Sequence, residues 1–105
     1  MAQFVLYKNQ DKQTRKTYPY FVDVQNALFS DLNSRVVIPF VNLDSFKKTD
    51  AERLCPLILI QNKKYVMLTH QITTVPASIL EVGETSLEDF RYQILDAIDM
   101  LITGI

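Results

Sequence analysis

The chain has 105 residues, a length that fits one domain, and 48% of them are hydrophobic while 22% are charged. Its 11 basic and 12 acidic residues give a net charge of −1, which argues against direct binding to nucleic acid, because non-specific binders carry a clear excess of Lys and Arg. No apolar run approaches the ~20 residues needed to cross a bilayer, and the start does not have the pattern of a signal peptide. We therefore expect a single cytoplasmic domain spanning residues 1–105, with no membrane association.

Short segments rich in β-branched and aromatic residues recur along the chain and predict β-strands. They are residues 3–8, 20–25, 36–40, 57–61, 65–70 and 75–80. Alternation in the second segment predicts one apolar face and one partly solvated face that carries Asp23 and Gln25. Because proline cannot donate a hydrogen bond to a neighbouring strand, Pro39 and Pro76 predict edge strands or bulges.

The segments between these strands are polar. Residues 9–17 form the longest polar stretch and predict a mobile loop between the first two strands. Residues 61–64 predict a tight hairpin turn in which Asn62 takes a positive φ and the two lysines are solvated. A short helix is predicted within residues 44–54, beginning near Asp44 or Thr49.

The C-terminal part of the chain predicts the only long helix. Ser86-Leu87-Glu88-Asp89 has the form of a capping box, with Ser86 as the N-cap and Asp89 reaching back to it. One apolar stripe then recurs at helical spacing and consists of Leu87, Phe90, Ile94, Ile98, Leu101 and Ile105. Many short strands followed by one helix indicate an α+β, mainly β domain, in which a curved antiparallel sheet forms a small barrel with the helix against one side.

The end of this helix has more apolar surface than one core contact covers, since Leu95, Met100 and Ile102 lie outside the stripe. Either the helix lies between two layers of its own domain, or its end is a recognition site. Acidic residues occupy the end where the helix dipole favours cations, and no Lys or Arg follows Arg91. We therefore expect this face to contact a basic patch on a protein partner, through Tyr92, Leu95, Asp96, Asp99 and Thr103.

The chain offers little for catalysis or metal binding. Cys55 is the only cysteine and His70 the only histidine, which excludes an internal disulfide, a multi-cysteine zinc site and a histidine pair. Two glycines cannot form a glycine-rich phosphate-binding loop. We expect a buried Cys55, a structural His70, and neither metal nor cofactor. RNA cleavage stays open as an alternative, because Arg35 or Arg53 could stabilise a phosphorane without a metal.

Several short segments also form an ordered pattern along nearly the whole chain. They are Gln3-Phe4, Phe21-Val22-Asp23-Val24-Gln25, Arg35 with Val37-Ile38-Pro39, Met67 with Thr69, Val75-Pro76, Ala97-Ile98 and Gly104-Ile105. In order and spacing this set resembles the CcdB toxins, which belong to plasmid and chromosomal toxin–antitoxin pairs. The resemblance implies a homodimer with an SH3-like barrel, related in fold to the MazF ribonucleases, that is not an enzyme.

The resemblance also implies partners and a site. The implied function is binding of the DNA gyrase A subunit and trapping of its cleaved-DNA complex, with a MazF-like RNA-cleaving toxin or a non-toxic relative as alternatives. The implied counterpart is a CcdA-like antitoxin, short and partly disordered, that removes the toxin from gyrase. The gyrase contacts carried over to this sequence are Leu28, Phe29, Tyr92, Leu95, Asp96, Asp99, Thr103, Gly104 and Ile105.

The candidate antitoxin surface is the polar loop of residues 9–17, through Lys12, Arg15 and Lys16. A cationic loop suits an acidic disordered partner, and the alternative is a plain solvated loop.

One position departs from the family pattern. A well-known member of the family has a tryptophan immediately before its terminal Gly-Ile, and that ring stacks on an arginine of gyrase, whereas this chain has Thr103. Threonine cannot stack, and losing such an anchor costs about 2 kcal/mol of binding free energy. The resemblance therefore implies weaker gyrase binding, a shifted set of contacts, or the gyrase of another host.

Overall fold

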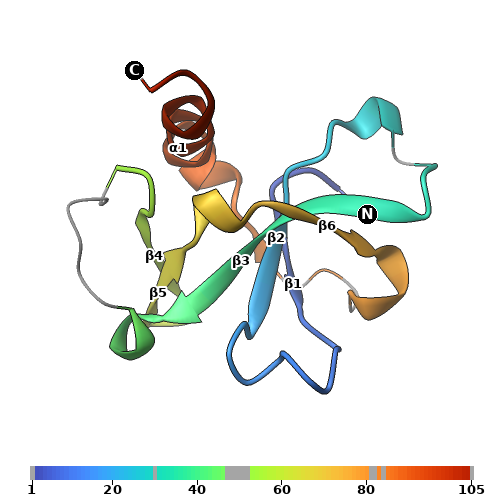
Figure 1. Cartoon of the computed structure of the whole chain (residues 1–105), viewed down its shortest axis with the longest axis horizontal. Helices are drawn as coiled ribbons and strands as arrows, with labels where there is room; N and C mark the ends of the chain where they lie inside the picture. The colour runs from blue at the N-terminus through green and yellow to red at the C-terminus, as the bar shows by residue number, and fades with distance from the viewer. Residues whose placement is uncertain (1, 30, 47–52, 81–82, 84, 105) are drawn as a thin grey trace.

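One curled antiparallel sheet and a C-terminal helix form the described part of the protein (Figure 1). The structure is a computed structural model that describes residues 2–29, 31–46, 53–80, 83 and 85–104. Its strands are β1 (Val5–Lys8), β2 (Tyr20–Asp23), β3 (Ser34–Asn42), β4 (Leu57–Ile60), β5 (Lys63–Met67), β6 (Thr73–Pro76) and β7 (Thr85–Ser86). The α-helix is α1 (Arg91–Thr103), and single 3₁₀ turns are η1 (Ala27–Phe29), η2 (Leu43–Ser45), η3 (Thr69–Gln71), η4 (Ala77–Ile79) and η5 (Glu88–Phe90).

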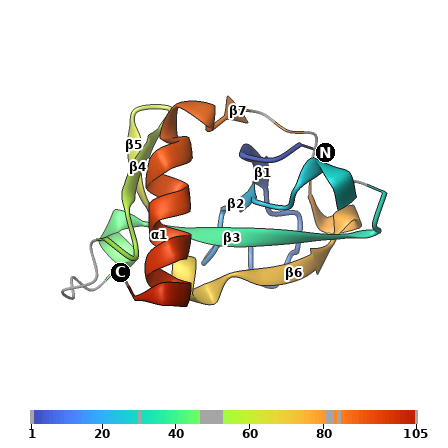
Figure 2. The same ribbon diagram turned by 90° about the horizontal axis from the view of Figure 1, so that it is seen from above.

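Strand β3 organises the sheet. The strand order is β4-β5-β3-β2-β1-β7, and β6 also pairs with β3. One edge of β3 pairs with β2, whereas its other edge pairs first with β6 over residues 34–37 and then with β5 over residues 40–42. Strands β6 and β5 pair with the same edge of β3 at successive positions along it. The sheet therefore curls into a half-barrel, and α1 lies across one end of it (Figure 2). This architecture confirms the predicted α+β, mainly β fold.

The two prolines behave differently. Pro76 ends β6, which pairs only with β3 within the described residues, so its assignment to an edge strand is confirmed. Pro39 lies inside the central strand β3, and its assignment to an edge or bulge is wrong. The carbonyl of Pro39 accepts a hydrogen bond from the Leu68 N–H at 2.9 Å, so its nitrogen faces the same side, at the point where β3 changes partners. No ladder hydrogen bond is lost there.

Several strand boundaries differ from the prediction. Gln61 and Asn62 both have positive φ, 51° and 66°, which makes a two-residue hairpin turn and confirms Asn62. The lysines that follow are exposed residues at the start of β5, not turn residues, as Lys63 pairs with Ile60. Strand β6 ends at Pro76 and continues as η4, so the predicted strand over residues 75–80 is misplaced.

The main core lies between the sheet and α1. Sheet residues such as Ile38 and Met67 are fully buried in it, together with Ile94 and Ala97 of the helix. The opposite face of the sheet carries smaller clusters, one of which contains Phe21 and Val37. Because both faces are covered, the expectation of a partly solvated face on β2 is wrong.

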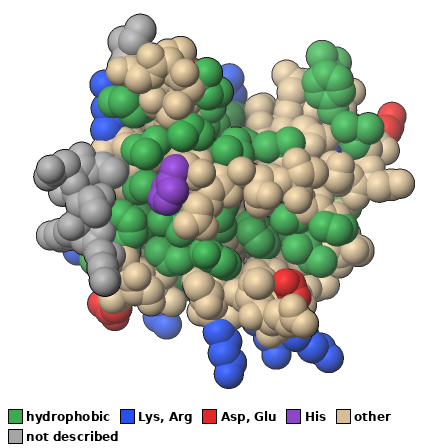
Figure 3. All heavy atoms as spheres, in the orientation of Figure 1, with side chains coloured by type: hydrophobic (Ala, Val, Ile, Leu, Met, Phe, Trp, Pro, Cys, Tyr) green, Lys and Arg blue, Asp and Glu red, His purple; other side chains and the backbone are tan. Residues whose placement is uncertain are grey.

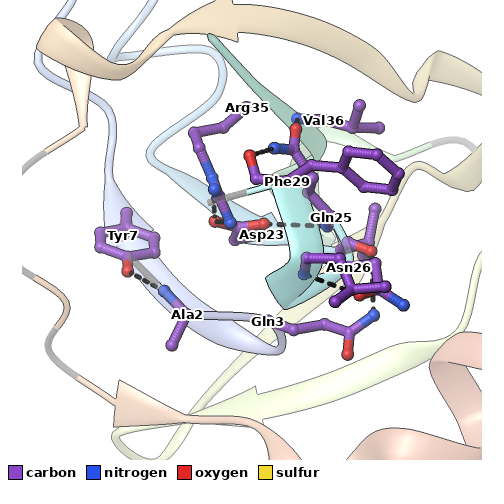
Figure 4. Close-up of polar contacts among 11 residues, drawn as sticks. Ala2, Gln3, Tyr7, Asp23, Gln25, Asn26, Phe29, Arg35 and Val36 are labelled. Carbon is purple, nitrogen blue, oxygen red and sulfur yellow. Dashed lines mark hydrogen bonds and ion pairs between the residues drawn. The ribbon is translucent and has the colours of Figure 1, made fainter. Parts of the chain in front are cut away.

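Polar residues on that face are instead buried in a network (Figure 4). Asp23 is fully buried and pairs with Arg35, whose Nε and Nη2 both lie 2.7 Å from Asp23 Oδ2. Asp23 Oδ1 accepts the backbone N–H of Gln25 at 2.9 Å. Burial raises the pKa of the Asp23 carboxyl, while the Gln25 N–H and the Arg35 guanidinium oppose that rise.

The ends of α1 depend on local backbone contacts. The helix begins at Arg91, after η5, so Ser86 is not its N-cap; the Ser86 hydroxyl accepts the Glu88 N–H at 3.2 Å instead. Gly104 closes the helix in the left-handed region, with φ of 72°, and its N–H donates to the Met100 carbonyl at 3.0 Å.

The helix predicted within residues 44–54 is only partly described. Leu43–Ser45 forms the 3₁₀ turn η2, which includes Asp44, and Thr49 lies outside the described residues. Among the helices that the structure describes, none has the length and apolar character needed to cross a bilayer.

Candidate functional site

The outer face of α1 carries exposed apolar and acidic side chains. Tyr92 is 84% exposed and Ile102 is 74% exposed, although Ile94 on the opposite face is fully buried. The remaining expected helix residues Asp96, Asp99, Thr103 and Gly104 are exposed as well, and Ile105 lies outside the described residues. The predicted surplus of apolar surface at the helix end is therefore confirmed at Ile102.

Leu95 needs a correction. It was expected on the exposed face, but it is half-buried and packs against the main core. Ala97, which was not assigned to the apolar stripe, is fully buried, while Ile98 and Leu101 are half-buried. The buried stripe is thus wider than predicted and extends towards Leu95, because a larger part of the helix circumference contacts the curled sheet.

A second exposed apolar group lies in the connection between β2 and β3. Leu28 is 85% exposed, Phe29 is 55% exposed and Leu32 is 54% exposed; we call these three residues the tip. The backbone beneath them is hydrogen-bonded, since the Leu28 N–H donates to Asn26 Oδ1 at 2.9 Å and the Phe29 N–H donates to the Asn26 carbonyl at 3.0 Å. The tip is a formed turn with its apolar side chains in solvent.

The tip and α1 lie on the same side of the molecule. In Figure 1 both η1 and α1 rise above the sheet, and Figure 2 shows them at opposite ends of β3. Figure 3 shows two prominences there with a hollow between them. The structure therefore places the expected contacts on one side of the protein, in two separate groups.

The acidic end of α1 is partly neutralised within the chain. Arg53 Nε and Nη2 donate to the two carboxylate oxygens of Asp96 at 3.0 and 2.9 Å, and both side chains are about half exposed. The expectation of an electrostatically unsatisfied helix end is therefore wrong for Asp96. Sequence reasoning missed this pair because Arg53 lies 43 residues before Asp96 and on another element.

The Arg53 pairing makes the titration of Asp96 predictable. Hydrogen bonding to Arg53 holds the pKa of the Asp96 carboxyl below its ordinary value of 3.8. The contribution of the pair to folding stability is thus present above pH 3.8 and is lost as the pH falls through the lowered pKa. In an NMR titration of the carboxyl carbon we expect a lowered pKa in the wild type and its return towards 3.8 in Arg53→Gln. Identical titrations in the two proteins would show that the pair does not form in solution.

The loop of residues 9–17 is built around the buried side chain of Asn9. Its amide donates to Thr14 Oγ1 at 2.9 Å and to the Tyr18 carbonyl at 3.0 Å, and its Oδ1 accepts the Asp11 N–H at 2.9 Å. The Arg15 N–H also donates to the Asp11 carbonyl at 2.9 Å. These bonds give the loop a compact conformation, and its mobility stays a prediction.

The candidate antitoxin residues project from this loop. Lys12, Arg15 and Lys16 are all exposed. The loop lies at the bottom of Figure 1, away from α1 and η1, and Figure 3 shows basic side chains gathered at that end. The two candidate surfaces are therefore far apart on the protein.

The side chains considered for catalysis are buried or paired within the chain. Cys55 is 5% exposed, as expected, and burial raises the pKa of its thiol, which opposes the thiolate form needed for nucleophilic attack, although Sγ lies 3.5 Å from His70 Nδ1. Arg35 is 1% exposed and paired with Asp23, while Arg53 is paired with Asp96. Within the described residues, no cluster of three or more His, Cys, Asp and Glu side chains could hold a metal ion.

The protein is a small half-barrel with a C-terminal helix and exposed apolar groups on one side, a kind of surface that often marks a site of protein–protein contact. Residues 3–104 match the family model described as CcdB protein. The chain belongs to the CcdB family, a family of toxins from toxin–antitoxin systems and not of catalytic enzymes.

Proposed function

We propose that this protein binds the A subunit of DNA gyrase through the tip and the outer face of α1, and that it traps the complex in which the DNA is cleaved. Membership of the CcdB family supports this proposal. The observation that carries it is the exposure of Leu28 in η1 and Ile102 in α1, 85% and 74%, because these two elements lie on the same side of the protein (Figure 1). Large aliphatic side chains left in solvent in this way are typical of a surface that a partner covers.

Trapping requires more than tight binding. A ligand that binds the open and closed forms of gyrase equally shifts no equilibrium, so the toxin must bind the open, cleaved form more tightly. A homodimer, which we also propose, presents two tips and two helix ends to a two-fold symmetric enzyme. Sedimentation of the free protein tests the dimer separately.

The test is a cleavage assay with the purified protein, gyrase, ATP and supercoiled plasmid. We expect linear DNA with covalently attached gyrase to accumulate after the proteins are denatured. Loss of supercoiling without cleavage would contradict trapping, and absence of any effect would contradict gyrase as the target. Incubation of the protein alone with RNA tests the MazF-like alternative, and cleavage of that RNA would replace the proposal.

The position of Thr103 gives a prediction for affinity. Its side chain is exposed, and its hydroxyl donates to the Asp99 carbonyl at 2.7 Å, so an aromatic ring at this position would project into solvent at the helix end. We expect Thr103→Trp to tighten gyrase binding about 10-fold, because tryptophan is the most effective anchor for an arginine of a partner. Titration of labelled gyrase A subunit measures this change, and weaker binding would mean that Thr103 belongs to a differently shaped contact.

We further propose that a CcdA-like antitoxin binds at Lys12, Arg15 and Lys16. The compact loop offers three exposed cations to an acidic segment. Charge reversal at Lys16 should weaken antitoxin binding and leave gyrase binding unchanged, because the loop and the tip lie at opposite ends of the protein.

A further inference from the structure

The amide side chain of Gln25 bridges the tip and the sheet (Figure 4). Gln25 is only 8% exposed, although it directly precedes a solvent-exposed turn. Its Nε2 donates to the Phe29 carbonyl at 2.7 Å, and its Oε1 accepts the Val36 N–H at 3.0 Å. One side chain thus binds the backbone of η1 on one side and the backbone of β3 on the other.

Gln25 replaces a missing part of the ladder between β2 and β3. The Val24 N–H donates to the Val36 carbonyl at 3.0 Å, as in a regular antiparallel pair. The returning bond from the Val36 N–H goes to the Gln25 side chain instead of to the backbone of the neighbouring segment. The chain can therefore leave the sheet and form the tip at this point without an unpaired N–H on β3.

Gln25 is itself held from below. Its backbone N–H donates to Asp23 Oδ1, and Asp23 is fixed by the buried ion pair with Arg35. A continuous set of bonds thus runs from the interior of the sheet to the carbonyl of Phe29. Within the described residues, the other hydrogen bonds of η1 are local to the turn. The Leu28 and Phe29 N–H groups donate to Asn26, and the Leu32 N–H donates to the Phe29 carbonyl at 3.2 Å.

We propose that Gln25 is a positioning residue that fixes the orientation of Leu28 and Phe29 relative to the sheet, so that the tip is preorganised for its partner. The inference rests on the proposed gyrase contact, because the partner named for the tip is the gyrase A subunit. Gln25 does not touch that partner; it acts through Phe29. A turn fixed before binding loses less conformational freedom on docking, which increases affinity.

The test uses two variants and a control matched in stability. Gln25→Asn keeps the amide but is one methylene too short to reach both Phe29 and Val36, and Gln25→Met keeps the length without hydrogen bonding. The control is a variant of Ile60, which is buried in the main core on β4. Of Ile60→Val and Ile60→Ala, we choose the one whose loss of folding stability matches that of the Gln25 variants. Binding to the gyrase A subunit is measured at a temperature where every variant is fully folded.

We expect both Gln25 variants to bind at least 10-fold more weakly, and the Ile60 control to bind like the wild type. Amide hydrogen exchange of the free proteins gives an independent measurement: exchange at Leu32 and Val36 should become faster in the Gln25 variants only. If the Gln25 variants bind and exchange like the wild type, the inference is wrong, and it is also wrong if the Ile60 control loses affinity equally. If the wild type does not bind gyrase, the proposed function fails, and the exchange data alone then decide whether Gln25 fixes the tip.

Discussion

Replacing Asp23 by alanine is expected to lower the free energy of unfolding by about 3–5 kcal/mol, the usual effect of leaving one member of a buried ion pair without its partner. Asp23 is fully buried and Arg35 is 1% exposed, so the guanidinium in the variant would have neither the carboxylate nor water around it. For a domain whose stability is about 5–15 kcal/mol, this is a large fraction of the total. Urea denaturation at low temperature measures the loss.

The chain contains its own control for this experiment. Asp96 also pairs with Nε and Nη2 of an arginine, Arg53, but on the surface. We expect Asp96→Ala to change stability only slightly, since exposed pairs compete with water and are screened by salt. Equal losses in the two variants would mean that burial does not determine the strength of the Asp23 pair.

A double variant separates the ion pair from the space it fills. Arg35 Nη1 has no hydrogen-bond partner among the described residues, so the cost of burying this guanidinium is incompletely compensated. Asp23→Leu combined with Arg35→Met removes both charges and keeps apolar volume. We expect it to recover most of the stability lost in Asp23→Ala, and a further loss would show that the network has a geometric role that apolar packing cannot replace.

Truncating one aliphatic side chain in each exposed group should have the largest effect on gyrase binding. We expect Leu28→Ala combined with Ile102→Ala to weaken binding about 100-fold, because burying each side chain at an interface contributes about 1.5 kcal/mol. Leu28 and Ile102 are 85% and 74% exposed in the free protein, so stability should hardly change. Titration with the gyrase A subunit and thermal unfolding measure the two quantities.

Leu59 supplies the matched control. It is 52% exposed on β4, and it points away from the main core that contains its neighbours Ile58 and Ile60. Leu59→Ala removes as many atoms as either single truncation, from a surface that the proposal leaves uncovered, so binding should not change. If Leu59→Ala weakens binding as much as the double variant, the gyrase contact lies on another face.

The fold could be predicted from local patterns because those patterns follow directly from backbone geometry. β-branched and aromatic segments marked the strands, Asn62 marked a turn with positive φ, and helical spacing marked α1. The start of α1 was placed too early because Ser86 bonds to Glu88 in a tighter turn than a capping box requires. The exposure of Ile102 followed from the helical spacing in the sequence, whereas Leu28 and Phe29, which are also exposed, were named only through the resemblance to the family.

The features that escaped prediction are contacts between distant parts of the chain. The pairing of Arg53 with Asp96 and of Arg35 with Asp23 depends on how the sheet curls, which no local window contains. The same holds for Leu95, whose burial depends on the breadth of the surface beneath α1. The role of Gln25 had a partial signal, a polar residue at the end of an apolar strand, but its partners Phe29 and Val36 are defined only by the folded backbone.

Strand β3 has a consequence for how the molecule assembles. It pairs along one edge with β2 and along the other with both β6 and β5, so these three strands share one nine-residue partner. Loss of β3 would remove the pairing partner of β2, β5 and β6 at once, which favours an all-or-none unfolding transition over stepwise melting. Residues 40–42 of β3 pair with residues 65–67 of β5, so the intervening chain must close into a loop before this pairing can form. The entropy cost of closing that loop lowers the folding rate.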